Sequence, residues 1–403
     1  MLTSSGPLPR WVVASGLGLT LMLGLGTSSY LLTVLAGPIK AETGWGLEWI
    51  IAGLTVATIG RGIASPAIGR WVKRSGGQTA LMISSGFFAA GLSTMAMSHH
   101  FAVYLAGWVL MGCGMACGLY EPVFGTLGRL YGLEARRLIV ATTLWGGFAS
   151  TVFWPLSGLL THQVGWRWTC VVYAALHLVI ALPIYRWVLP GRQHLLPAPE
   201  DKPPPPADAQ SARRDRITVF GFGLALIGEV FVTGSMLTHL VALLGARGVS
   251  TAAAIALGAF VGPAQVAARL GEMVLGSRHH PGLSLLAATL LIATGVVCIA
   301  FLPPAGLPVA FVFFGMGSGL IATSRGTLGL HLFGPIEAPV VLGKLGRPVA
   351  FMSAVMPWLT AVAITHLGGK TTLSLMSVAA WPMVIGAVIL WVSAGRTKAS
   401  PER

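Results

Sequence analysis

The chain has 403 residues, of which 54% are hydrophobic and only 9% charged, and its mean hydropathy is +0.77. A soluble domain normally carries about a quarter charged residues, so this composition excludes an ordinary soluble protein and indicates a chain built for a lipid bilayer. The net charge of +14 does not indicate nucleic-acid binding, because the basic residues form no dense tract interleaved with aromatic residues.

Apolar runs predict the helices. A bilayer core about 30 Å thick is crossed by roughly 20 helical residues. The sequence contains twelve such runs, at residues 11–37, 47–71, 79–98, 101–128, 138–161, 168–189, 217–244, 251–276, 282–302, 306–330, 347–366 and 371–394. We therefore expect an all-α membrane protein with twelve transmembrane helices.

The most polar, proline-rich stretch lies between the sixth and seventh runs, at residues 190–216, and predicts a linker. It divides the chain into an N-terminal six-helix bundle at 1–189 and a C-terminal six-helix bundle at 217–403. Placing both termini and this linker in the cytoplasm puts 20 of the 26 basic residues on that side, as membrane proteins prefer. We expect an integral protein of a bacterial inner membrane with this orientation, which functions as a monomer.

The second span contains Arg61, about 14 residues from its start and so near mid-membrane. An ionisable residue there is costly and usually faces a cavity or a partner. We expect Arg61 to contact an anionic substrate; the alternative is a structural partner on another helix, such as Glu229. Tyr30 in the first span and Tyr120 in the fourth are expected to line the same cavity, although lipid contact or helix packing is the safer default for aromatic residues in spans.

The fourth span carries two cysteines and one acid. Cys113 and Cys117 share a helical face, which could hold a soft metal ion but equally suits a packed helix interface. We expect no metal site. Glu121 lies near the predicted cytoplasmic end of the same span.

A repeated phrase links the fourth span to the tenth. GMACGLYEPVFGTLG at 114–128 and GMGSGLIATSRGTLG at 315–329 are identical at eight of fifteen positions. Their spaced small residues are typical of closely packed membrane helices. Because Glu121 and Arg325 lie at nearly corresponding depths, we expect them to pair across the two halves and act in gating. The alternative is that each meets a different loop charge.

The seventh and eighth spans carry three ionisable residues. Glu229 lies about 12 residues into the seventh, where an acid removed from water is suited to proton coupling or, equally, to a fixed ion pair with an arginine. Arg269 lies about 18 residues into the eighth. We expect it to bind substrate, and the alternative is a local ion pair with Glu272 three residues later.

With twelve spans, two halves and a basic central linker, the chain resembles the major facilitator superfamily over nearly its whole length. After the second span the chain reads Gly69-Arg-Trp-Val-Lys73-Arg74-Ser-Gly76-Gly77, which is similar to that family's gating motif. The resemblance implies a gating role for Lys73 and Arg74, but Lys73 stands where the family usually has Asp. The turn Gly165-Trp166-Arg167-Trp168 also resembles the family's junction between the fifth and sixth helices.

Within that superfamily the chain looks most similar to the monocarboxylate and oxalate–formate porters. Their eighth helix has an Asp and, four residues later, an Arg that binds the substrate carboxylate. Arg269 matches the Arg, and Gln265 stands at the position of the Asp. The resemblance implies that Arg269 and Gln265 belong to the substrate site.

These observations favour a secondary transporter that works by alternating access, carries a small monocarboxylate-like anion and is coupled to protons. One alternative is an efflux carrier for drugs or trivalent metalloids, and another is a membrane sensor with a transporter fold and no flux. No phosphate-binding loop or catalytic constellation is present in the sequence, so neither an enzyme nor a cofactor is expected. The expected partners are a small molecule and the lipid bilayer.

Overall fold

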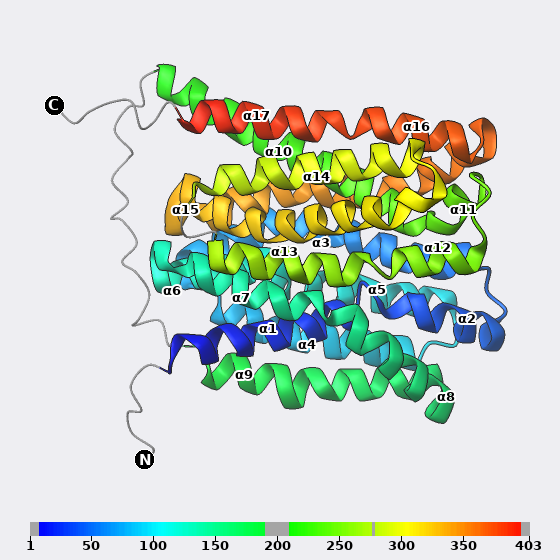
Figure 1. Ribbon diagram of the computed structural model, residues 1–403. Coiled ribbons are helices and arrows are strands. Elements are labelled where there is room, and N and C mark those ends of the chain that lie inside the picture. Colours follow the sequence, from blue (N-terminus) through cyan, green and yellow to red (C-terminus); the bar gives the residue numbers. More distant parts are fainter. Residues whose placement is uncertain (1–7, 190–208, 276–278, 396–403) are drawn as a thin grey trace, which may run out of the picture. The chain divides into compact units, whose positions relative to one another are not determined.

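The structure is a computed structural model and describes residues 8–189, 209–275 and 279–395 (Figure 1). Almost all of these residues are helical, and no strand occurs among them. The α-helices are α1 Arg10–Gly26, α2 Leu31–Thr43, α3 Leu47–Ser75, α4 Gln78–Ala96, α5 Phe101–Gly118, α6 Tyr120–Tyr131, α7 Ala135–Gly147, α8 Ala149–Leu176, α9 Leu182–Trp187, α10 Ala209–Thr238, α11 Leu240–Gly245, α12 Thr251–Gly258, α13 Val261–Leu275, α14 Pro281–Phe301, α15 Leu307–Leu367, α16 Gly369–Ala379 and α17 Trp381–Gly395. The predicted all-α membrane architecture is confirmed.

Within the described residues, nine helical stretches are long and apolar enough to cross a membrane. Two of them are too long for a single pass, since Phe101–Trp187 has 87 residues and Pro304–Leu367 has 64. The first is interrupted at Gly132 and Gly165 and the second at Gly334, where φ is 60°, 81° and 70°. Such positive φ angles end a helix and are open mainly to glycine. The three interruptions turn nine stretches into twelve passes, the number that the sequence predicts.

The positions of these turns repeat between the two halves. In the described residues seven glycines have positive φ, and six of them pair at nearly constant spacing: Gly44 with Gly248, Gly132 with Gly334, and Gly165 with Gly368. The spacings, obtained by subtraction, are 204, 202 and 203 residues. The last pair also shares ψ, at 164° and 155°. The backbone therefore supports the structural repeat that the sequence phrase predicts.

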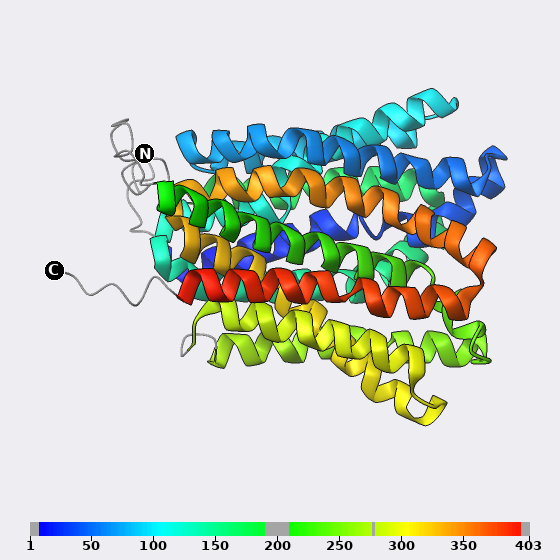
Figure 2. The same cartoon turned by 90° about the horizontal axis from the view of Figure 1, so that it is seen from above.

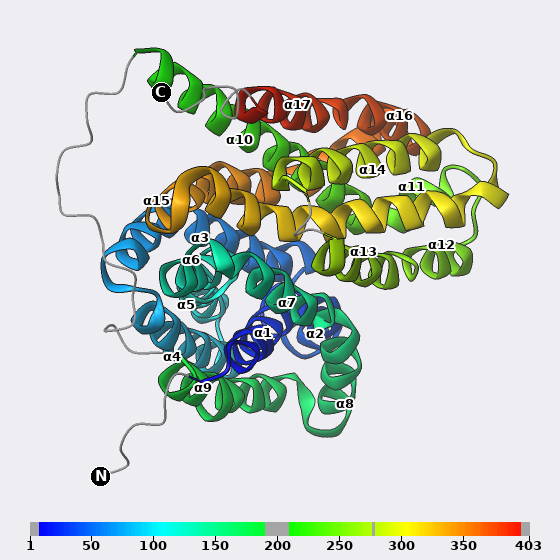
Figure 3. The ribbon, with the colours of Figure 1, turned by 60° about the vertical axis from the view of Figure 1, so that its left-hand side comes forward.

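The chain groups into two compact units, and the first comprises residues 1–197 and 329–351. Within it, α5 packs along both α3 and α4, and α1 packs along α7 (Figure 3). Large aromatic residues fill its core, among them the fully buried Trp108 and Tyr104. The Tyr104 hydroxyl donates to the carbonyl of Ile50 at 2.8 Å, which fixes α5 to α3.

The second unit comprises residues 198–328 and 352–403. In it α17 packs along α10 and α14, and Figure 2 shows α10 in green beside α17 in red. The His239 ring, at the break between α10 and α11, lies 2.8 Å from the carbonyl of Pro357. α10 begins at Ala209, inside the predicted linker, and residues 190–208 of that linker lie outside the described residues. The predicted bundle boundaries stay predictions.

Candidate functional site

The second unit brings Glu229 of α10 and Arg325 of α15 into electrostatic interaction. Both side chains are half-buried. Each comes from the interior of a long apolar helix, where an ionised group is stable mainly beside a partner of opposite charge. The sequence pattern predicts a proton-coupling role or an arginine partner for Glu229, but it does not identify Arg325 as that partner. The expected pairing of Arg325 with Glu121, which belongs to the first unit, stays a prediction.

Arg269 and Gln265 lie on α13, where it packs against the first part of α15. Arg269 is 4% exposed, and its Nε donates to the carbonyl of Gly319 at 3.4 Å. The helices approach closely here because residue 319 is glycine: a Cβ at that position would lie 2.5 Å from the carbonyl oxygen of Gln265. Gln265 is half-buried one turn before Arg269. Gly319, which accepts this hydrogen bond from Arg269, lies within the repeated segment 315–329.

Glu272, the alternative partner considered for Arg269, has partners on other segments. Its carboxylate accepts bonds from the Ser284 hydroxyl at 2.9 and 3.0 Å, and His279 Nε2 lies 3.9 Å from it. Glu272 is 6% exposed. It therefore joins α13 to the start of α14, and the alternative pairing of Glu272 with Arg269 stays a prediction.

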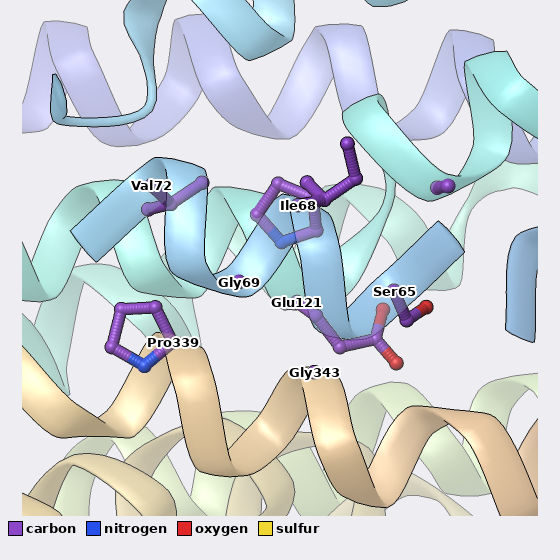
Figure 4. Close-up of a pocket in the computed structure, with 9 residues that line it drawn as sticks. Ser65, Ile68, Gly69, Val72, Glu121, Pro339 and Gly343 are labelled. Atoms are coloured by element: carbon purple, nitrogen blue, oxygen red, sulfur yellow. The ribbon is translucent and has the colours of Figure 1, made fainter. Parts of the chain in front are cut away.

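In the first unit Glu121 and Ser65 line a cavity of about 10 Å³ between α3, α6 and α15 (Figure 4). Figure 4 shows the Glu121 carboxylate directed to the side of Ser65, opposite Gly343. A cavity of this size has room for about one water molecule, so it cannot hold an organic substrate. The Ser65 hydroxyl also donates to the carbonyl of Arg61 at 2.8 Å. Arg61 itself is half-buried on α3.

An ion pair links α3 to α15 at the end of this unit, next to the cavity. Lys73, near the end of α3, pairs with Glu337, which follows the Gly334 turn of α15. The two side chains are 36% and 52% exposed. Arg74 beside it is exposed. The sequence motif around Lys73 does not identify Glu337 as its partner, although Glu337 is the one acid among residues 329–351.

The two predicted tyrosines lie on the first unit. Tyr30 precedes α2, and its ring meets Trp154 of α8 edge-on at 6.0 Å. Tyr120 begins α6, and its ring lies 5.6 Å from Phe124. Both tyrosines are half-buried. Each is therefore held by a neighbouring aromatic ring while part of its surface stays accessible.

Cys113 is half-buried and Cys117 is buried one turn later on α5, and both are free thiols. No group of three or more His, Cys, Asp or Glu side chains suited to a metal ion occurs in the described part of the chain. A two-thiol pair alone supplies fewer ligands than the four of a closed soft-metal site.

At the opposite end of the first unit an open groove of about 640 Å³ lies between α2 and α8. Glu42 at its rim accepts bonds from Trp166 Nε1 at 2.6 Å and from Arg167 Nε at 2.7 Å. Arg167 Nη1 also donates to the carbonyl of Ala96 at 2.6 Å. The motif Gly165-Trp166-Arg167 therefore anchors three turns to one another, which is a structural use of those residues.

The family model described as Major Facilitator Superfamily matches residues 16–346. The solved structure of the human organic anion transporter MFSD10 (TETRAN) matches with a TM-score of 0.69 at 16% identity, covering 94% of this chain and 99% of that chain. FucP, a transporter of the same superfamily solved in the outward conformation, matches with a TM-score of 0.74 at 14% identity, over 94% and 99% of the two chains.

The proton:xylose symporter XylE matches with a TM-score of 0.70 at 11% identity, over 95% of each chain. No curated protein matches the sequence at a significant level. Identities this low show a shared fold and carry no assignment of substrate.

Proposed function

We propose that this chain, which belongs to the Major Facilitator Superfamily, is a secondary transporter that moves a small organic anion together with a proton. The match to the family model covers residues 16–346, well over half of the chain, and supports a carrier that works by alternating access. The anionic substrate and the proton coupling rest on the charged residues of the second unit. The monocarboxylate and oxalate–formate branch is the proposed subfamily.

The interaction between Glu229 and Arg325 is the observation that carries this proposal. While Glu229 is ionised, it neutralises the guanidinium in a setting where an uncompensated charge is costly. A proton on Glu229 removes that compensation. The guanidinium then gains most from an incoming carboxylate, with which it forms charge-assisted and often bidentate hydrogen bonds. Proton and anion therefore favour each other's binding.

The balance of charge at Glu229 and Arg325 also sets the direction in which proton and anion move. A carrier that holds both ligands has the same balance of charge at this pair as one that holds neither, because the substrate carboxylate replaces the glutamate carboxylate. A carrier with only one of the two ligands has an unbalanced charge. If the balanced states are the ones that change conformation, anion and proton cross together in the same direction.

Arg269 is the alternative cation for the substrate. It is more deeply buried than Arg325, and it already donates to the Gly319 carbonyl. This contact uses Nε, so a substrate carboxylate would have to bind the Nη groups of a side chain that is only 4% exposed. We therefore propose Arg325 as the principal anion contact, with Arg269 and Gln265 as supporting residues of the second unit.

The proposal also includes residues of the first unit. Arg61 supplies a further cation on α3, and the partly accessible rings of Tyr30 and Tyr120 supply apolar and hydroxyl contacts suited to a small organic molecule. These assignments extend the proposal and rest on burial and residue type.

Reconstituted vesicles test the function. The full chain is incorporated into vesicles and offered radiolabelled short-chain monocarboxylates, with radiolabelled xylose as an uncharged comparison. An inward proton gradient should drive accumulation of at least one carboxylate and leave the sugar unmoved. Accumulation of the sugar, or no flux of any carboxylate, would contradict the anion assignment.

Substitutions at the pair then test the mechanism. Glu229→Gln mimics the protonated acid, so it should keep exchange of labelled for unlabelled anion but lose gradient-driven accumulation. Arg325→Gln should lose both activities. Glu48→Gln, which removes a carboxylate from an exposed position at the start of α3, is the matched control and should transport normally.

A further inference from the structure

One arginine of the first unit is buried, and two of its guanidinium nitrogens have no hydrogen-bond partner among the residues that the structure describes. Arg129, near the end of α6, is 2% exposed. Its Nε and Nη1 atoms have no hydrogen-bond partner, and no described carboxylate pairs with it. A guanidinium cannot lose its charge in a protein, and a buried charge without compensation is strongly destabilising. Such an arrangement favours the binding of an anion.

The contacts of its neighbours on α6 indicate which segment Arg129 faces. Gly125 packs against Val72, since a Cβ at Gly125 would lie 3.0 Å from the Val72 Cγ1 atom. Thr126 lies directly against Gly77. Arg129 follows these two residues by four and three positions and so shares their face of the helix. Because helical side chains lean toward the N-terminal end of their helix, the guanidinium is directed back toward the segment 72–77.

That segment ends where α4, a long helix, begins. No side chain of the described residues caps the first-turn amide groups of this helix. Gly77 is the N-cap of α4, which has 19 residues, and no side-chain hydrogen bond caps it. The first-turn amides of a helix lack partners within the helix and, with the helix dipole, attract an anion. Helix geometry thus directs the buried guanidinium of Arg129 on α6 toward the uncapped N-terminus of α4.

Two acids near this end of the unit already have basic partners. Glu337 pairs with Lys73, and Glu134 pairs with Arg10 at 2.5 Å. Arg74, in the segment that faces Arg129, adds a further positive charge at an exposed position. The local charge is positive, and the protein supplies no carboxylate among its described residues to balance Arg129.

We propose that Arg129 and the N-terminus of α4 form a binding site for a phosphate group, which is distinct from the proposed transport pair. A guanidinium fork matches phosphate oxygens bidentately, and helix N-termini bind phosphate through backbone amides. This end of the unit is predicted to be cytoplasmic, where basic pockets between transmembrane helices hold anionic lipid headgroups. The phosphate belongs either to such a lipid or to free inorganic phosphate.

Thermal unfolding of the purified full chain distinguishes the sources. The protein is measured in nanodiscs of phosphatidylcholine alone, in the same nanodiscs with added sodium phosphate and sodium sulfate as an ionic-strength control, and in nanodiscs containing phosphatidylglycerol. A rise in the midpoint with phosphatidylglycerol alone identifies a lipid headgroup. A rise with inorganic phosphate above that with sulfate identifies free phosphate. A midpoint that is unchanged in every condition overturns the proposal.

Three variants distinguish phosphate binding at Arg129 from a nonspecific effect of the positive charge in this region. Arg129→Met removes the buried charge, so it should raise the midpoint in phosphatidylcholine and abolish the rise with the phosphate source. Arg129→Lys keeps the charge but loses the fork, and it should weaken binding by about tenfold to a hundredfold. Arg137→Ala removes an exposed arginine at the start of α7 and should respond like the wild type. If Arg129→Met lowers the midpoint equally in all conditions, the arginine has a structural partner and the phosphate site is refuted.

Discussion

Replacement of Gly319 by alanine tests how closely α13 and α15 pack around Arg269. The added Cβ would lie 2.5 Å from the carbonyl oxygen of Gln265 and 2.7 Å from its Cα, both of which are backbone atoms that cannot turn aside. The two helices must therefore separate. Overpacking of this kind costs about 1–3 kcal/mol.

The cost converts to a measurable temperature shift. With an unfolding entropy of about 2.1 cal/mol/K per residue over 403 residues, the midpoint of thermal unfolding should fall by about 1–4 °C. Separation of the helices also lengthens the 3.4 Å contact between Arg269 Nε and the Gly319 carbonyl. If that contact positions Arg269 for the substrate, anion affinity should fall as well.

The matched control is Gly271→Ala on α13. A Cβ at Gly271 meets no atom within 4 Å, and alanine is favoured over glycine in a helix by up to about 1 kcal/mol. Its midpoint should stay the same or rise by about 1 °C. Equal midpoints for Gly319→Ala and Gly271→Ala, measured by intrinsic fluorescence in detergent, would refute the close packing on which the placement of Arg269 depends.

Two further predictions concern the first unit. The Lys73–Glu337 pair is partly exposed, so its coupling energy should be only about 0.2–1 kcal/mol. A double-mutant cycle with Lys73→Gln and Glu337→Gln measures this energy. The reversed pair, Lys73→Glu with Glu337→Lys, should recover most of the stability that either single substitution loses. A coupling energy of zero would show that the pair contributes nothing to stability. Cys113→Ser and Cys117→Ala should leave anion transport within about twofold of the wild type, because the buried Cys117 and the half-buried Cys113 act as small packing side chains on α5. Loss of transport in either variant would favour the soft-ion hypothesis.

The sequence predicts the twelve passes because each is a long apolar run, and the two halves because the repeat extends even to the turn glycines. The breaks at Gly165 and Gly334 fall in the predicted gaps between the fifth and sixth spans and between the tenth and eleventh spans. The sequence does not predict that helical structure continues up to both glycines. The transporter class follows from the same pattern.

The candidate site is less predictable, because pairing between charges depends on how helices pack. Glu229 and Arg325 stand out from the sequence as isolated charges, but their electrostatic interaction appears only in the folded chain. Glu337 lies 264 residues from Lys73 along the chain, beyond the reach of any local pattern. The sequence also cannot predict that no described carboxylate pairs with Arg129, because this depends on where each acid lies in the folded chain.

Proton flux measured together with anion uptake tests the central claim most directly. In vesicles that contain a pH-sensitive dye and the full chain, the initial rates of anion entry and proton entry are recorded without an imposed gradient of protons. The account predicts one proton for each monocarboxylate in the wild type and anion exchange without proton movement in Glu229→Gln. Anion entry through the wild type with no accompanying proton would contradict the proposal that Glu229 and Arg325 couple the two.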